Sequence, residues 1–283
     1  MKDIKEIFMQ VLFMLTACVS ILAVVLICIF MFANGLPAIA EIGPLNFLLG
    51  QKWKPNNGIF GIFPMIIGSI YVTVGAIIVG VPIGFFVAVY MAKFCSPKVY
   101  RFVKPAIELM AGIPSIVYGF FGLVVLVPIM QDVFGGGGKN VLTASILLGI
   151  MILPTIISVA ESNIRAVPES YYEGSLALGA TPERSVFFAV LPGAKSGILA
   201  GIILGIGRAI GETMAVIMVA GNQPIIPKSP LFGVRTLTAN IVMEMGYATD
   251  LHRDALIATA VVLFILILIL NSCCSALQRK GEK

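Results

Sequence analysis

The sequence predicts an all-α polytopic membrane protein with six transmembrane helices. Of its 283 residues, 59% are hydrophobic and only 12% are charged, whereas about a quarter of the residues in a soluble domain are charged. The mean hydropathy is +1.03. Six apolar stretches are long enough to cross a membrane as helices of about 20 residues. They cover approximately residues 7–33, 64–92, 105–131, 141–161, 196–220 and 254–276.

The connections between these stretches are short, which predicts a single transmembrane domain over residues 1–283. The isoelectric point near 9.0 comes from basic residues in the short flanks of the predicted spans. Flanking Lys and Arg residues are typical of membrane proteins. The basic balance therefore does not indicate a nucleic-acid partner.

The basic residues also predict the orientation. With an even number of spans, both termini lie on one side of the membrane, and that side collects twelve Lys and Arg residues against six on the other. Cytoplasmic loops are enriched in Lys and Arg. We therefore expect both termini, the 93–104 loop and the 162–195 loop to be cytoplasmic. Lys2 and Lys5 precede an apolar run over residues 7–32, which is longer than the core of a signal peptide, so we favour an uncleaved first span.

Residues 171–192 form the most informative polar interruption, YYEGSLALGATPERSVFFAVLP. Gly179 is placed to end one short helix. Thr181 is a good N-cap and Pro182 fits the first position of a second helix. An apolar stripe of Val186, Phe187 and Val190 follows before Leu191 and Pro192 end the run. The pattern suits either a module that another protein grips or an amphipathic hairpin on lipid headgroups.

This stretch resembles the "EAA" loop of ABC-transporter permeases. The resemblance is carried by Glu173, Gly174, Ala177, Gly179, Leu191 and Pro192. The sequence departs from the motif where Gly174 and Ser175 replace two alanines. The resemblance implies that the 162–195 loop is a coupling segment, which docks into a groove on a separate cytosolic ATPase.

The predicted fifth span carries two charges. Arg208 and Glu212 are four residues apart, so on a continuous helix they would share one face. A charge at mid-bilayer costs roughly 2.5–3.5 kcal/mol on insertion scales, and such residues usually mark a transport route. The alternative is an ion pair that offsets its own cost. Glycines at every fourth position, 197, 201 and 205, and again 207 and 211, predict close helix packing.

Three strings resemble the phosphate permeases of the PstC type. They are WKPNNGIFGIFPMIIGS at 53–69, ELMAGIPSIVYG at 108–119 and GRAIGETMAVIMVAGN at 207–222. The resemblance implies a type I ABC importer permease in a bacterial or archaeal cytoplasmic membrane. It implies a substrate pathway at Arg208 and Glu212, a second permease subunit, cytosolic ATP-binding subunits and an extracytoplasmic phosphate-binding protein. ATP and Mg²⁺ would bind the partner ATPase, with no cofactor in this chain.

Several alternatives remain at this stage. A permease for sulfate or molybdate would share part of the pattern, as would the sister permease of the same phosphate complex, although Met214 to Val216 and Gly221-Asn222 favour the PstC type. An intramembrane enzyme would need a nucleophile with a base, or a metal cluster. The acids considered for such a role are Glu108 and Glu212, which lie on different predicted helices, and His252 has no second ligand nearby in sequence. A purely structural scaffold would not explain Arg208.

The GGGGK string at 135–139 does not make the chain an ATPase. A Walker A motif needs a glycine where Val133 stands and Ser or Thr where Asn140 stands. We therefore expect a chain that is not itself an enzyme.

Overall fold

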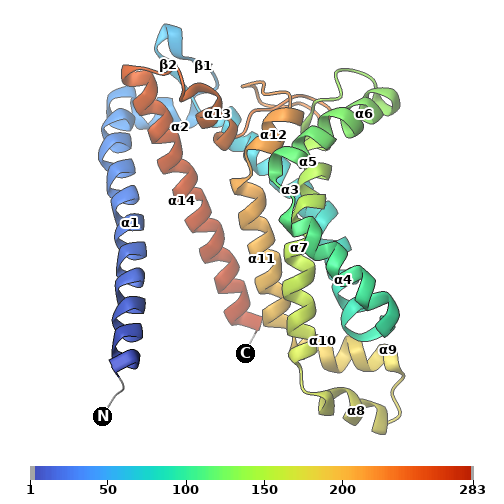
Figure 1. Ribbon diagram of the computed structural model, residues 1–283. Helices are drawn as coiled ribbons and strands as arrows, with labels where there is room; N and C mark the ends of the chain where they lie inside the picture. The colour runs from blue at the N-terminus through green and yellow to red at the C-terminus, as the bar shows by residue number, and fades with distance from the viewer. Residues whose placement is uncertain (1–3, 282–283) are drawn as a thin grey trace.

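The computed structural model describes residues 4–281 and consists of long helices with one short hairpin (Figure 1). Among those residues, five helices are long and apolar enough to cross a membrane. There are six if the bent pair Pro182–Gly193 and Lys195–Gly211 is one span. The prediction of an all-α membrane protein is confirmed. The start of α1, the end of α14 and α8 lie at one end of the molecule, here called the α8 end, and the hairpin lies at the opposite, hairpin end.

Helices α1 (Ile4–Ile42) and α14 (Asp250–Gly281) pack side by side at one edge of the molecule. The first helix is longer than predicted because it continues through Pro37 to Ile42. It is followed by α2 (Pro44–Leu49) and by an antiparallel hairpin. The hairpin consists of β1 (Trp53–Lys54), the 3₁₀ turn η1 (Pro55–Asn57) and β2 (Ile59–Phe60).

Helices α3 (Phe63–Val89) and α7 (Val141–Ala166) form the most extensive helix pair. A Cβ atom at Gly80 would lie 2.8 Å from the carbonyl oxygen of Gly149, so only glycine permits this approach. Helix α3 continues through Pro82 and ends in the π-helical turn η2 (Tyr90–Phe94). The buried residues between α3 and α7 make up the centre of the largest core cluster.

Helix α11 (Lys195–Gly211) packs on the other side of α7. Cβ atoms at Gly197, Gly201 and Gly205 would lie 2.0, 3.1 and 2.9 Å from side-chain atoms of α7, which confirms their predicted packing role. Gly207 and Gly211 are different. Nothing lies within 4 Å of a Cβ placed at either position, so the close packing predicted for this second pair is wrong within this chain.

The predicted span 105–131 is not one helix, because the chain breaks within it. Helix α4 (Pro97–Gly112) ends at Ile113 and Pro114, which are extended, and α5 (Ser115–Phe121) starts after them. Proline disfavours the helical conformation of the residue before it, which explains the break. The chain continues as the π-helical turn η3 (Gly122–Leu126) and α6 (Val127–Phe134), and the candidate span is Ser115–Phe134.

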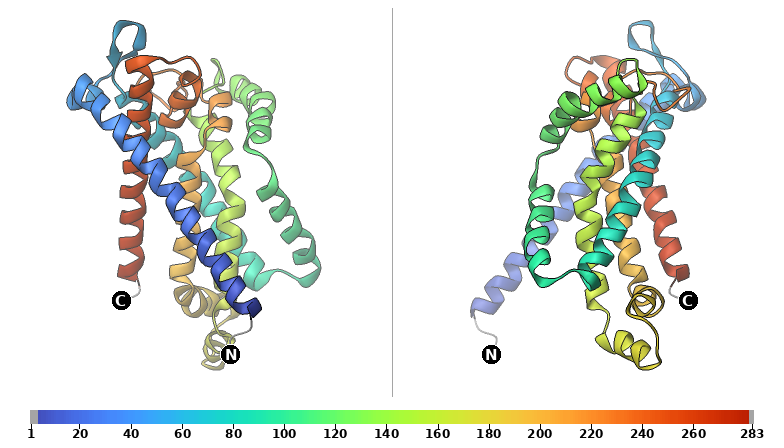
Figure 2. Two further views of the ribbon diagram at one scale, coloured as in Figure 1. Left: turned by 60° about the vertical axis from the view of Figure 1, so that its left-hand side comes forward. Right: turned by 90° about the vertical axis from the view of Figure 1, so that its right-hand side faces the viewer.

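The α8 end carries a compact helical module that lies across the bundle (Figure 2). It contains α8 (Glu169–Ala177), α9 (Pro182–Ser185), the π-helical turn η4 (Val186–Val190) and α10 (Leu191–Gly193). The segment 182–193 is bent by 72° from α11. At the hairpin end, α12 (Met214–Val219) and α13 (Leu237–Glu244) complete the fold.

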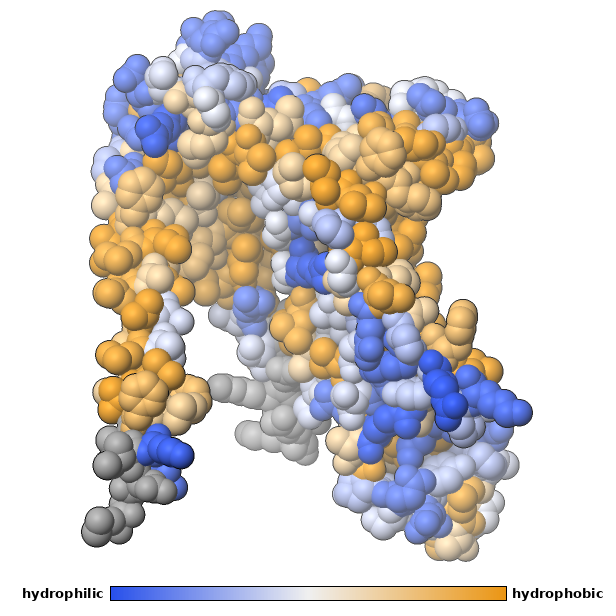
Figure 3. Space-filling view, viewed as in Figure 1, coloured by the Kyte–Doolittle hydropathy of each residue, from blue (hydrophilic) through white to orange (hydrophobic). Residues whose placement is uncertain are grey.

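The surface divides as a membrane protein requires (Figure 3). Hydrophobic residues cover the middle of the face shown, whereas hydrophilic residues gather at the hairpin end and around the module at the α8 end. Hydrophilic surface also interrupts the apolar band at the level where α11 ends.

Candidate functional site

The break between α11 and α12 separates the two charged residues of the predicted fifth span. Helix α11 ends at Gly211, and Glu212 adopts an extended conformation with ψ near 130°. The sequence interpretation that Arg208 and Glu212 share one face of a continuous helix is therefore wrong. The helix stops between them, so residues 196–220 are not one helix: α11 ends at Gly211 and the short α12 begins at Met214.

Glu212 serves the following helix. Its Oε1 accepts hydrogen bonds from the backbone N–H groups of Thr213 at 3.1 Å and Ala215 at 3.3 Å. Its backbone carbonyl accepts a bond from Thr238 Oγ1 at 3.2 Å. A carboxylate on the first N–H groups of a helix satisfies donors that have no partner inside the helix. Glu212 is thus held at the start of α12 and is only partly exposed.

Arg208 points toward α7 instead. Its Nη1 lies 3.5 Å from Thr155 Oγ1, at the limit of a hydrogen bond. Within residues 4–281 its guanidinium makes no ion pair with Glu212. Arg208 is partly buried and lies in the last turn of the apolar helix α11, so a permanently charged group with spare donors ends that helix. Glu212, four residues later, has different partners.

The predicted coupling segment has the predicted local structure. Gly179 has φ of +84°, Thr181 caps α9 by accepting from the N–H of Arg184, and Pro182 occupies the first turn. Glu173, Gly174, Ala177 and Gly179 are exposed, and Leu178 is 91% exposed. The predicted apolar stripe is buried at Val186 and Val190 but not at Phe187. Leu191 is buried and Pro192 is exposed, and the helix runs on to Gly193 rather than ending at them.

Sequence reasoning missed a buried acid at the α8 end. The Glu161 side chain is 2% exposed and accepts from Tyr100 Oη at 2.8 Å, Lys104 Nζ at 2.7 Å and Arg165 Nε at 2.7 Å. The pKa of the Tyr100 phenol is raised, mainly by its hydrogen bond to Glu161 and secondarily by burial. The i, i+4 spacing of Glu161 and Arg165 was a local signal, but the two partners on α4 were not foreseeable from it.

A second missed acid lies at the hairpin end. Glu244, whose side chain is 8% exposed, accepts from Arg235 Nη1 at 2.5 Å and Trp53 Nε1 at 2.8 Å, and its Oε2 lies 2.9 Å from His252 Nε2. Arg235 also donates to the backbone carbonyl of Asn222. This cluster ties the hairpin, α13 and α14 together.

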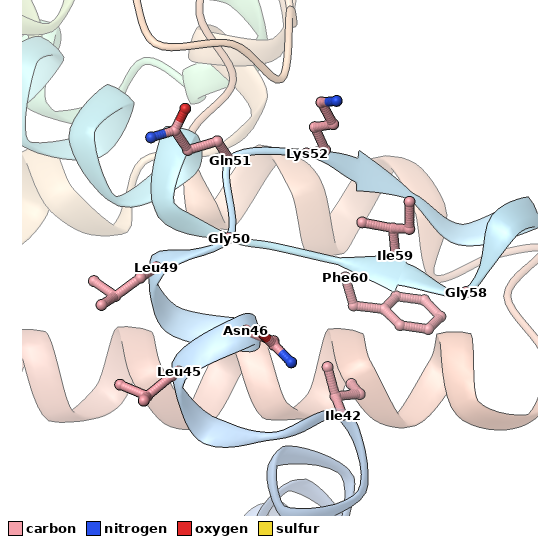
Figure 4. A pocket seen from close by; sticks show the side chains of 10 residues that line it. All are labelled: Ile42, Leu45, Asn46, Leu49, Gly50, Gln51, Lys52, Gly58, Ile59 and Phe60. Atoms are coloured by element: carbon pink, nitrogen blue, oxygen red, sulfur yellow. The ribbon is translucent and has the colours of Figure 1, made fainter.

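An open hollow of about 630 Å³ lies beside the same hairpin (Figure 4). The side chains of Ile42 and Phe60 point toward each other there, whereas Leu45 and Leu49 project from α2 and are exposed. Neither Arg208 nor Glu212 lines it. The hollow is therefore a surface feature of the hairpin end, separate from the α11–α12 break.

The chain is similar to known proteins in both sequence and fold. Residues 80–280 match the family model described as the binding-protein-dependent transport system inner membrane component. The chain belongs to this family. It is 37% identical over 260 residues to a probable ABC transporter permease protein, YqgH, of Bacillus subtilis, covering 89% of this chain and 84% of that protein.

It is also 34% identical over 275 residues to the phosphate transport system permease protein PstC of Mesorhizobium japonicum, again covering 89% and 84% of the two chains. Among solved structures, an inward-facing form of the MetNI methionine ABC transporter aligns with a TM-score of 0.64. That alignment covers 81% of this chain and 99% of the other at 20% identity, so it supports the fold alone. The architecture is that of the ABC importer permeases.

Proposed function

We propose that this permease is a membrane subunit of an ATP-driven phosphate importer, with a translocation route past Arg208 and Glu212. The observation that carries the proposal is the interrupted helix, which leaves an arginine and a carboxylate in the apolar layer, each with incomplete or backbone-only partners. The planar fork of arginine donors matches a tetrahedral oxyanion. The relatives named as phosphate permeases support the same substrate.

The role of Glu212 follows from electrostatics. In a site of low dielectric, Arg208 attracts an anion strongly and would release it slowly. Glu212 lies close along the chain and can leave the N–H groups of α12 to pair with Arg208 as the anion departs. We therefore expect an exchange of partners during each cycle, in which Glu212 binds α12 in one state and Arg208 in the other.

The rest of the importer comes from other chains. The exposed segment 171–192 is the surface that we expect cytosolic ATP-binding subunits to grip, and those subunits would hold ATP and Mg²⁺. A second permease subunit would complete the pathway, and an extracytoplasmic phosphate-binding protein would deliver the ion at the hairpin end. This chain would hydrolyse nothing itself, and its α8 end and both termini would be cytoplasmic.

Phosphate uptake tests the proposal. The chain would be produced with its partner subunits in a cell that lacks its own high-affinity phosphate importer, and uptake of labelled phosphate would be measured. We expect uptake that unlabelled sulfate and molybdate do not reduce. Uptake of sulfate or molybdate in place of phosphate would overturn the substrate assignment, and the absence of any bound ATPase on purification would overturn the coupling.

A further inference from the structure

Glu161 is the centre of a polar cluster that the translocation site does not use. It lies in α7, five residues before that helix ends at Ala166, and its carboxylate is almost completely buried. Three donors converge on it from two helices, Tyr100 and Lys104 on α4 and Arg165 on α7 itself. A buried carboxylate with this many charged partners is costly to disturb, because removing one partner leaves another charge unpaired.

Arg165 extends the cluster to a third element. Its Nη2 donates to the backbone carbonyl of Met91 at 2.6 Å, in the π-helical turn η2 at the end of α3. Its guanidinium also lies over the Tyr100 ring, 4.4 Å from the centroid. One arginine therefore joins α7, the end of α3 and the first half of α4.

The same π-helical turn holds the start of α8. Lys93, two residues after Met91, binds Glu169 at 2.9 Å and lies over the Tyr172 ring at 5.4 Å from its centroid. The Lys93 side chain is only 12% exposed, so this contact is shielded on one side. These contacts connect α8 to η2 and, through Met91 and Arg165, to Glu161.

Further contacts connect α4, through α5, to the α11–α12 break. Tyr118 Oη on α5 donates to the carbonyl of Met110 at 2.9 Å, which bridges the Pro114 break and holds α5 to the end of α4. Helix α5 packs on α12 so closely that a Cβ at Gly119 would lie 2.9 Å from the Cα of Ala215. The N–H of Ala215 is one of the two backbone donors to the Glu212 carboxylate.

From this arrangement we propose that Glu161 is a positioning residue that couples the α8 module to the Arg208–Glu212 site through α4. The inference rests on the proposed function and names the connection by which the ATPase would act on the pathway. The cluster makes α7, η2 and α4 one rigid unit at the α8 end, so a push on α8 turns α4. Through Tyr118 and α5, that movement reaches α12 and its contact with Glu212.

The Glu161 cluster could only stabilise the assembled complex, or it could also transmit movement from α8 to the pathway. Both hypotheses predict lower phosphate uptake when the cluster is broken, but a purely stabilising cluster changes only how much complex assembles. Transmission predicts that ATP hydrolysis and phosphate movement come apart in the complex that does assemble. The ratio of phosphate imported to ATP hydrolysed therefore separates the two.

The first experiment uses the full complex in lipid vesicles and measures both rates in the same preparation. We expect Glu161→Gln to lower the phosphate moved per ATP by about tenfold, within the range usual for coupling between two sites, with hydrolysis largely retained. Lys104→Gln should produce a smaller loss in the same direction. The matched control is Lys98→Gln, an exposed lysine on the same helix, which should leave the ratio unchanged.

Because Lys104 acts through Glu161, the two changes should not add. The double variant Glu161→Gln with Lys104→Gln should match Glu161→Gln alone, as expected for residues of one network. A wild-type ratio in Glu161→Gln, or equal loss of uptake and hydrolysis, would overturn the proposal while leaving the importer assignment intact.

A second measurement does not depend on the substrate. Spin labels at Lys98→Cys on α4 and Ser170→Cys on α8, in a chain whose native cysteines are replaced, would report the distance between the two helices with and without nucleotide. We expect one narrow distance in both states, broadened by Glu161→Gln. A distance in the otherwise native complex that changes with nucleotide, or one that Glu161→Gln does not affect, would overturn the linkage even if the transported ion proved not to be phosphate.

Discussion

Arg208 and Glu212 show how a short interruption in a helix changes what two residues can do. On a continuous helix they would pair with each other at i, i+4 and offset much of their burial cost. Because α11 ends at Gly211, Glu212 instead caps α12 and Arg208 is left beside Thr155. Two separately held charges are better suited to an exchange of partners than a closed ion pair.

Replacing Arg208 with lysine should test the importance of the guanidinium. Arg208→Lys retains the positive charge and loses the bidentate fork, so phosphate uptake should fall by about tenfold or more, as for the loss of one hydrogen bond to a charged group. Uptake of labelled phosphate, normalised to assembled complex, measures this. Uptake equal to that of the unchanged protein would show that a point charge is sufficient.

Replacing Glu212 with glutamine should slow turnover while the complex still assembles. The amide keeps the size of the side chain but cannot compete as an anion for Arg208. The double variant Arg208→Gln with Glu212→Gln distinguishes pathway residues from a structural pair: we expect it to insert, bind its ATPase and transport little. Near-normal uptake by that double variant would refute the role assigned to both residues.

Glu244 is a residue whose importance is structural. Its carboxylate is the common acceptor for Arg235, His252 and Trp53 and is nearly buried. Glu244→Ala should destabilise the hairpin end by roughly 3 kcal/mol, because it leaves Arg235 partly buried without a counter-ion. Thermal unfolding in detergent would detect the change, and Glu41→Ala, an exposed acid at the end of α1, is the control. Equal melting temperatures for the two variants would contradict this account.

The geometry of the α8–α10 module depends on the backbone conformation of Gly179. Gly179 has φ of +84°, a conformation that residues with a Cβ rarely adopt, and nothing within 4 Å would obstruct a side chain there. The constraint is therefore conformational rather than steric. It sets the angle at which α8 leads into α9.

Gly179→Val should consequently distort the coupling segment and leave the membrane helices intact. We expect insertion at normal levels, with lower phosphate uptake and weaker stimulation of ATP hydrolysis by substrate. ATP turnover by the purified complex is the measurement. Gly137→Val, in an open turn of the hairpin-end loop, provides a comparison outside the module. Full substrate-stimulated turnover in Gly179→Val would sink the coupling assignment.

At the scale of the whole molecule, the ends of the bundle differ in charge. The start of α1 and the end of α14 lie at the α8 end, and the sequence places twelve basic residues in the flanks predicted for that side. Basic flanks remain in the cytoplasm. This bias predicts a bundle whose α8 end faces the cytoplasm.

Cysteine labelling in intact cells tests the orientation. Asn56 lies in the hairpin and Ser170 in α8, at opposite ends of the molecule, and both are exposed. With the native cysteines replaced, Asn56→Cys should react with a membrane-impermeant reagent added outside, and Ser170→Cys should react only after the cells are opened. Labelling of both from outside would invert or discard the topology.

The sequence alone determined the membrane class, the resemblance to the family and the turn at Gly179. Hydropathy depends on composition within about 20 residues. The Gly179 turn and the Thr181 cap depend on contacts within a few residues, and both were confirmed because local sterics decide them. Helix α1 extends past the predicted span 7–33 to Ile42, where Ala38 still packs against α14, and hydropathy alone does not predict that packing.

Only the tertiary structure decided which partners the charged residues have. Trp53 and Glu244 are 191 positions apart, and Lys104 and Glu161 are 57 apart, so no spacing rule could pair them. The sequence placed Arg208 and Glu212 in one span, but the end of α11 at Gly211 separated their partners. The physical reason is that a buried charge is held by whichever groups the packed helices bring within bonding distance, and that choice exists only after the helices have assembled.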